Sequence, residues 1–300
     1  MKNTFALKGT IVQADGPQRL AVCEGYAVCE NGVCAGTFAA LPGKYAGLPV
    51  ADYTGKLVVP GLVDLHVHAP QYAYRGTAMD LELLDWLDRY TFPEEAHYAD
   101  AQYAQKGYAD FVQAIKNTAT TRAVVFGTLH TDATLTLMRL LDAAGMAGFV
   151  GKVAMDRNKS REPWAEAGLA EPRRWLDAWH GDAAAANGRV HPILTPRFTP
   201  SVTPGYMRGL GELAAARHLP VQSHLSENPK EIEWVQAPSA QRETLISEKL
   251  GTGPSAPTVA QDDDYVKTRV GPVWLVLDRK QNRIVASHDI VVDEDPAQHL

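Results

Sequence analysis

The chain lacks several features that define specialised classes of protein. None of its apolar runs reaches the about 20 residues that a membrane-spanning helix needs, and its first residues carry no sustained apolar stretch typical of a secretory signal. Its net charge is −6, from 29 basic and 35 acidic residues, and it has no basic run. We therefore expect no membrane partner, no nucleic-acid partner and no secretion signal.

Cysteine is also scarce. The chain has three cysteines, Cys23, Cys29 and Cys34, and so low and odd a number argues against a disulfide framework. Their spacing does not form a CxxC pair, so we interpret them as small side chains of a strand-rich segment rather than as a metal knot. Free thiols fit a reducing compartment, and we expect a cytoplasmic protein.

Apolar residues are plentiful enough for a sizeable core, at 45% of the 300 residues against 21% charged. Residues 1–59 contain short apolar runs broken by Gly, Pro, Asn and Asp, which predict small antiparallel strands in a β-sandwich-like domain. From Pro60 onward, predicted strands alternate with predicted helices. The strands are expected over residues 61–68, 122–128, 148–155, 189–195 and 220–224, and the helices over residues 100–116, 133–144, 171–180 and 203–217.

Strands that alternate with helices of this length are typical of βαβ units and a parallel sheet. We predict an α/β fold based on a (β/α)8 TIM-type barrel over residues 60–236, incomplete because the five expected strands are too few to close it. Residues 237–264 are rich in Pro, Ser, Gly and acid and predict a linker. In the tail, 265–300, PVWLVLD and RIVASHDIVVD flank the turn RKQN and predict a β-hairpin.

The clearest chemical signal is the pair His66 and His68 at the end of the first barrel-type strand. Side chains at i and i+2 of a strand point to the same face, so two imidazoles converge on one point, as a metal ion requires. Barrel active sites lie at the carboxyl ends of the strands. A HxH pair alone is a weak signal, and its position is what favours a metal site.

A second group of polar residues follows later strands and the first loop. His224 ends the fifth expected strand, and Glu227 follows it, where a carboxylate can move a proton between water and a leaving amine. Gln71 can both donate and accept hydrogen bonds to a heterocycle. Arg197 can hold a carbonyl oxygen and Phe198 can stack on a ring. Taken singly, such residues are more often structural, capping or surface residues.

Six segments together closely resemble guanine deaminases of the amidohydrolase superfamily. They are PGLVDLHVHAPQY, LLDWLDRYTFPEEAHY, FGTLHTDAT, FVGKVAMDRN, HPILTPRFTPS and VQSHLSENPKEI, and the resemblance covers about residues 1–236. It implies one Zn²⁺ per chain, bound by His66, His68 and His224. It also implies guanine held by Gln71 and Arg197 with Phe198 nearby.

The same resemblance implies a reaction and an assembly state. Zinc-activated hydroxide attacks the ring carbon that bears the amino group, Glu227 carries the proton, and xanthine and ammonia result. The family is typically dimeric, so a homo-oligomer is expected. An open parallel sheet points the same way, because its edge and apolar interior favour association.

The sequence departs from the family pattern at its C-terminal side. The resemblance implies a His after strand six and an Asp at the end of strand eight, and residues 237–300 hold neither in the expected setting. The nearest match, Ser287-His288-Asp289, lies within the predicted hairpin. Three hypotheses follow. The chain is an impaired deaminase, or an inactive truncated or fused homologue that binds zinc or a purine, or its hairpin is an interaction module.

Overall fold

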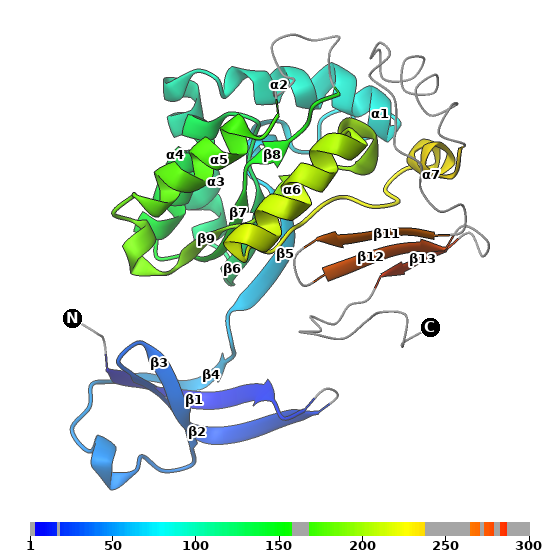
Figure 1. The fold of residues 1–300 in the computed structure, drawn as a ribbon. Coiled ribbons are helices and arrows are strands. Elements are labelled where there is room, and N and C mark those ends of the chain that lie inside the picture. The colour runs from blue at the N-terminus through cyan, green and yellow to red at the C-terminus, as the bar shows by residue number, and fades with distance from the viewer. Residues whose placement is uncertain are drawn as a thin grey trace. The chain divides into compact units, whose positions relative to one another are not determined.

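The structure of the chain is a computed structural model (Figure 1). It describes residues 4–16, 19–157 and 168–237, and the backbone of three strands within residues 265–286. The chain divides into two compact units, Met1–Leu62 and Val63–Leu300. Among the described residues, no helix is both long enough and apolar enough to cross a bilayer.

The Met1–Leu62 unit contains one four-stranded sheet with the strand order β3-β2-β1-β4. Its strands are β1 Phe5–Ala14, β2 Leu20–Glu30, β3 Val33–Phe38 and β4 Val50–Val58. Asn31 and Gly32 both adopt positive φ between β2 and β3, as a tight hairpin requires. The first three strands are antiparallel, as the sequence predicts.

Strand β4 differs from the expectation because it pairs with β1 in parallel. The connection to β4 includes the short helix η1, Gly43–Tyr45, and Tyr45 is buried with Ala6 and Val28. This connection takes the chain past the sheet to its other edge, where β4 runs alongside β1. The described residues of this unit therefore form one sheet and a small apolar cluster, and not two packed sheets.

The Val63–Leu300 unit is built on a parallel sheet with the order β5-β6-β7-β9. The strands are β5 Leu62–His68, β6 Thr120–Phe126, β7 Ala147–Gly151 and β9 Val190–Pro192. Beyond this sheet, β8 (Val153–Ala154) pairs in parallel with β10 (Thr195–Pro196). The order of the strands in space follows their order in the sequence, which is typical of a TIM-type barrel.

The strand expected over residues 220–224 is shorter than predicted. It is reduced to two isolated parallel bridges, Leu194 with Val221 and Phe198 with His224. Between these bridges the Gln222 side chain donates to the Val125 carbonyl and to Thr195 Oγ1. At this end of the sheet, a side-chain amide therefore donates to groups of β6 and β10. His224 still lies beside Phe198, in the segment that follows β10.

Helices connect the strands of this unit. The expected helices correspond to α3 Ala101–Lys116, α4 Thr131–Ala143, α5 Ala170–His180 and α6 Pro204–Arg217. Asp100 caps α3 by accepting from the backbone N–H groups of Gln102 and Tyr103, and Thr203 caps α6. The elements that the sequence does not predict are η2 Pro70–Tyr74, α1 Leu83–Trp86, η3 Leu87–Thr91, α2 Phe92–His97, η5 Ala185–Asn187, η6 Thr199–Ser201 and α7 Pro229–Gln236.

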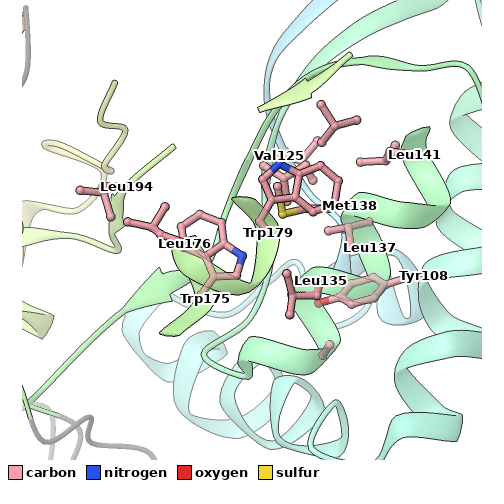
Figure 2. Close-up of a cluster of buried hydrophobic side chains, with 14 of the residues drawn as sticks. Tyr108, Val125, Leu135, Leu137, Met138, Leu141, Trp175, Leu176, Trp179 and Leu194 are labelled. Atoms are coloured by element: carbon pink, nitrogen blue, oxygen red, sulfur yellow. The ribbon is translucent and has the colours of Figure 1, made fainter. Parts of the chain in front are cut away.

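The main core lies between β6, β7 and the helices α3, α4 and α5 (Figure 1). Trp175 and Trp179 of α5, Leu137 and Met138 of α4 and Tyr108 of α3 belong to one buried cluster (Figure 2). These side chains are 0–3% exposed. Val67 of β5 and Tyr72, which neighbours Gln71, pack against this core.

The last described elements are β11 Tyr265–Val270, β12 Val273–Asp278 and β13 Arg283–Ala286, which form an antiparallel sheet in that order. Strands β12 and β13 pair as the two flanks of the predicted hairpin, and β11 was not expected. The turn RKQN and the motif Ser287-His288-Asp289 lie outside the described residues, as does nearly all of the predicted linker.

Candidate metal centre and its cavity

Three histidines meet at the carboxyl ends of the parallel strands. His66 and His68 share one face of β5, and His224 forms a parallel bridge with Phe198, which follows β10. One ring nitrogen of each lies within 4.8 Å of those of the other two. The Nε2 atoms of His68 and His224 are 2.8 Å apart. Phe126 of β6 is fully buried behind them and stacks on His68, with ring centroids 4.5 Å apart.

The surroundings of His68 and His224 favour the neutral form of both rings. Burial, together with the Arg197 charge, holds the pKa of His68 well below its usual range. Burial also lowers the pKa of His224 to about 4, against the opposing effect of its hydrogen bond to the Arg197 carbonyl. A carbonyl can only accept, so His224 Nδ1–H donates to it over 2.7 Å. This fixes the tautomer in which His224 Nε2 carries a lone pair toward His68.

These observations show that the three histidines fit a metal ion. A lone pair on His224 Nε2 points at a second ring nitrogen, and His68 Nδ1 is buried with no hydrogen-bond partner. A buried polar atom without a hydrogen-bond partner costs free energy. A cation bound between the imidazoles would interact with the ring nitrogens that no protein group satisfies. Neutral imidazole nitrogens are ligands that zinc prefers, and the hydrogen bond from His224 to a carbonyl is a typical outer-shell support.

The histidines form one wall of a cavity of about 440 Å³. Gln71 reaches it from η2, Arg197 and Phe198 from the segment after β10, and Glu227 from the loop before α7. All seven residues that the sequence singles out therefore line the same cavity. The apolar part of the wall, from α1 and η3, was not expected and includes Leu83, Trp86 and Leu87.

A tight turn brings Glu227 back to the cavity after His224. Ser226 adopts φ 56°, and the backbone N–H of Glu227 donates to Glu231 Oε2 over 2.9 Å. Burial raises the pKa of the Glu227 carboxyl, while the Arg197 charge opposes this shift. The side chain as a whole remains exposed, so solvent limits the size of the shift. Glu227 is thus a carboxyl group with a raised tendency to hold a proton.

Arg197 is fixed by a partner that sequence reasoning missed. Its Nη1 donates to Glu95 Oε2 over 2.7 Å, and both side chains are almost fully buried. The guanidinium also lies over the Phe92 ring, 5.2 Å from its centroid. Glu95 and Phe92 belong to the TFPEE segment of α2, which the resemblance includes without giving it a role. A pair separated by 102 positions leaves no local pattern in the sequence.

The parallel α/β sheet and the three histidines at its strand ends define a TIM-barrel-type protein with a candidate metal centre. The chain belongs to the amidohydrolase family, whose model matches residues 57–266. Among curated proteins it is similar to the guanine deaminase of Rattus norvegicus, with 43% identity over 180 residues, 60% of this chain and 39% of that protein. The guanine deaminase of Escherichia coli is 38% identical over 197 residues, 63% of this chain and 42% of that protein.

Solved structures agree with this family. The guanine deaminase from C. acetobutylicum, with guanine bound in its active site, matches with a TM-score of 0.72 and 33% identity, over 84% of this chain and 70% of that one. The E. coli enzyme matches with a TM-score of 0.65 and 28% identity, over 82% of this chain and 57% of that one. The chain spans 39–42% of the length of the first curated relatives it matches.

Proposed function

We propose that this chain takes part in the zinc-dependent hydrolytic deamination of guanine to xanthine and ammonia. The observation that carries the proposal is the cavity itself, in which three histidines lie together with Gln71, Arg197, Phe198 and Glu227. Relatives named guanine deaminase, one of them solved with guanine in its active site, support the choice of substrate.

In this proposal His66, His68 and His224 hold one Zn²⁺ per chain, which supplies the Lewis acidity that activates water at neutral pH. The protein's own groups position the substrate. Gln71 pairs with adjacent N–H and C=O groups of the purine, because its amide both donates and accepts. The Arg197 guanidinium donates to the ring carbonyl, and the Phe198 ring packs on the purine.

Glu227 moves the proton. Its position in the cavity, three residues after His224, lets it take a proton from water and deliver it to the departing amine. The raised pKa of this carboxyl favours the protonated form that the second transfer needs. Loss of ammonia is the step in which a proton donor matters most, since an amide anion is a very poor leaving group.

A specific observation also favours a second function. Within residues 4–16, 19–157 and 168–237, the candidate metal cluster consists of three histidines and no carboxylate joins it. The Asp that the resemblance implies would supply a ligand and a base. A chain without that Asp binds zinc and a purine but turns guanine over slowly or not at all. The second candidate is therefore a binding protein with a vestigial reaction.

One experiment separates these functions. The purified 300-residue chain is loaded with zinc, and guanine binding is measured by calorimetry beside ammonia release. Turnover that falls at least about tenfold in Glu227→Gln supports the deaminase. Binding without turnover supports the binding protein. A folded, zinc-loaded chain that neither binds nor converts guanine contradicts both.

The metal site has its own check. We expect His66→Ala to abolish stoichiometric zinc binding, measured by elemental analysis, because three nitrogen ligands become two. His191→Ala is the matched control, since His191 is an exposed strand residue of β9. Full zinc content in His66→Ala would show that the metal is held elsewhere.

A further inference from the structure

The buried ion pair between Arg197 and Glu95 does more than hold one side chain. The guanidinium is always charged, and the pair is removed from water, with 2% of the Arg197 side chain and 7% of the Glu95 side chain exposed. A buried cation is tolerated because a carboxylate compensates it. The cavity therefore receives the hydrogen-bond donors of Arg197 with little net positive charge.

The other charged groups of the cavity wall, Arg75 and Glu227, are exposed to solvent. Arg75 is exposed, with its guanidinium 3.9 Å from the centroid of the Tyr72 ring and its Nη1 donating to the Tyr72 carbonyl. Glu227 is also exposed. Solvent screens both groups far more than it screens the buried pair. Among the described lining side chains, Arg197 is the buried cation, so its compensation sets what the side chains add to the charge of a bound Zn²⁺.

Substrate and product differ in acidity. Deamination replaces the amino group of guanine with a second ring carbonyl, so xanthine loses a ring proton more readily than guanine does. An uncompensated guanidinium would attract the xanthine anion and delay its release. A guanidinium paired with a carboxylate holds the neutral ring by geometry and does not favour the anion.

We propose that Glu95 is a positioning residue for Arg197 and that its charge makes the pocket select the neutral purine over the anionic product. The proposal rests on the proposed function. The proposal assigns two roles to the Glu95 carboxylate. The hydrogen bond to Nη1 places the guanidinium, and the negative charge prevents the site from retaining xanthine.

Two substitutions separate these roles. Glu95→Gln keeps a hydrogen-bond acceptor of nearly the same shape but removes the charge. Glu95→Asp keeps the charge but draws the acceptor back by one methylene group. Glu94→Gln is the matched control, because Glu94 is the preceding residue on α2 and accepts from the Tyr103 hydroxyl.

Binding of guanine and of xanthine to the full chain is measured by calorimetry at one mildly alkaline pH, where part of the xanthine is ionised. For Glu95→Gln we expect guanine affinity within about threefold of the parent and xanthine affinity about tenfold higher. For Glu95→Asp we expect both affinities to fall about tenfold with their ratio unchanged. Glu94→Gln should bind both ligands as the parent does.

The outcomes are distinguishable. A parent chain that binds guanine, with the same guanine-to-xanthine ratio in Glu95→Gln, overturns this inference alone. A parent chain that binds no guanine overturns the proposed function, and this inference with it. If circular dichroism shows Glu95→Gln to be unfolded, the double variant Glu95→Gln/Arg197→Gln decides. This double variant removes both charges of the pair, so its ratio of guanine affinity to xanthine affinity should equal that of the parent, while guanine binds more weakly. A changed ratio contradicts the proposal.

Discussion

The pKa of Lys152 shows how strongly burial can change the proton affinity of a single side chain. Lys152 follows β7 in the sequence, its side chain is almost fully buried, and Nζ lies 3.5 Å from the Val153 carbonyl. Burial lowers its pKa to about 7, and the nearby Glu171 carboxylate opposes this shift. The folded chain therefore binds this proton far more weakly than the unfolded chain, whose lysine has the ordinary pKa of 10.5.

This difference predicts a pH-dependent stability. Below about pH 7 both states are protonated and the fold bears the full cost of a buried ammonium group. Between about pH 7 and 10.5 the unfolded state binds more protons, so the free energy of unfolding rises with pH and the cost disappears. Lys152→Met lacks this titration. Its stability relative to the parent should fall by about 1.4 kcal/mol per pH unit between about pH 7 and 9.

Urea unfolding at several pH values measures the effect. Lys106→Met is the control, since Lys106 is 80% exposed on α3 beside Asp110. Its curve should run parallel to that of the parent. A constant difference between Lys152→Met and the parent would show that Lys152 keeps its ordinary pKa in the folded chain.

Single residues also mark what the sequence can predict about the site. His66 and His68 were found because a strand repeats every two residues, so their shared face is a local property. Arg197 and Phe198 were singled out from their place at the end of an expected strand and from their chemistry, and the resemblance to a family added a role in holding guanine. Glu95 was missed because its role depends on a contact across the fold, which neither periodicity nor spacing records.

At the scale of elements, the position of η2 depends on its contact with α2 and α3. The Tyr98 hydroxyl, just after α2, donates to the Pro70 carbonyl over 3.3 Å, and Pro70 begins the short helix that carries Gln71. Tyr98 can approach because α3 has Gly107 beside it. A Cβ added at Gly107 would lie 2.6 Å from the Tyr98 hydroxyl oxygen. A glycine on α3 thus determines where a residue of the pocket lies.

Gly107→Ala tests this packing. Tyr98 is only 1% exposed and has little room to move, so we expect the free energy of unfolding to fall by roughly 1–3 kcal/mol. Displacement of η2, which carries Gln71, should also weaken the guanine binding proposed above. The control is Gly205→Ala on α6, where an added Cβ meets nothing within 4 Å. That variant should leave stability unchanged or raise it by up to about 1 kcal/mol. Equal effects of the two variants would refute the role of Gly107.

The elements differ in how well their sequence predicts them. The four longer helices have apolar faces with a helical period and were predicted within two residues at each end. Residues 83–97 were not predicted. They form two short helices around a π-helical turn, with Pro93 inside the second, and no stretch is long enough to show a period. Their conformation follows from packing around the pocket.

At the scale of the whole molecule, β5 is exposed in a way unusual for a strand of a barrel-type sheet. Among the described strands, β6 is its hydrogen-bonded neighbour and no strand pairs with its other edge. Val63 is 54% exposed and Leu65 73% exposed. An apolar strand with a free edge favours pairing with another chain, as the expected homo-oligomer requires.

We therefore expect the chain to associate in a concentration-dependent way, with β5 in the contact. Leu65→Glu places a charge on the face that Val63 and Leu65 share, while His66 lies on the opposite face and keeps its place in the metal cluster. Sedimentation should show association weakened at least about tenfold, because a charge would have to be desolvated in the contact. Unchanged zinc content confirms that the site survives. Leu20→Glu, at a residue 69% exposed in the Met1–Leu62 unit, should not alter association. Equal loss in both variants would show that general apolar exposure, and not the edge of β5, drives the contact.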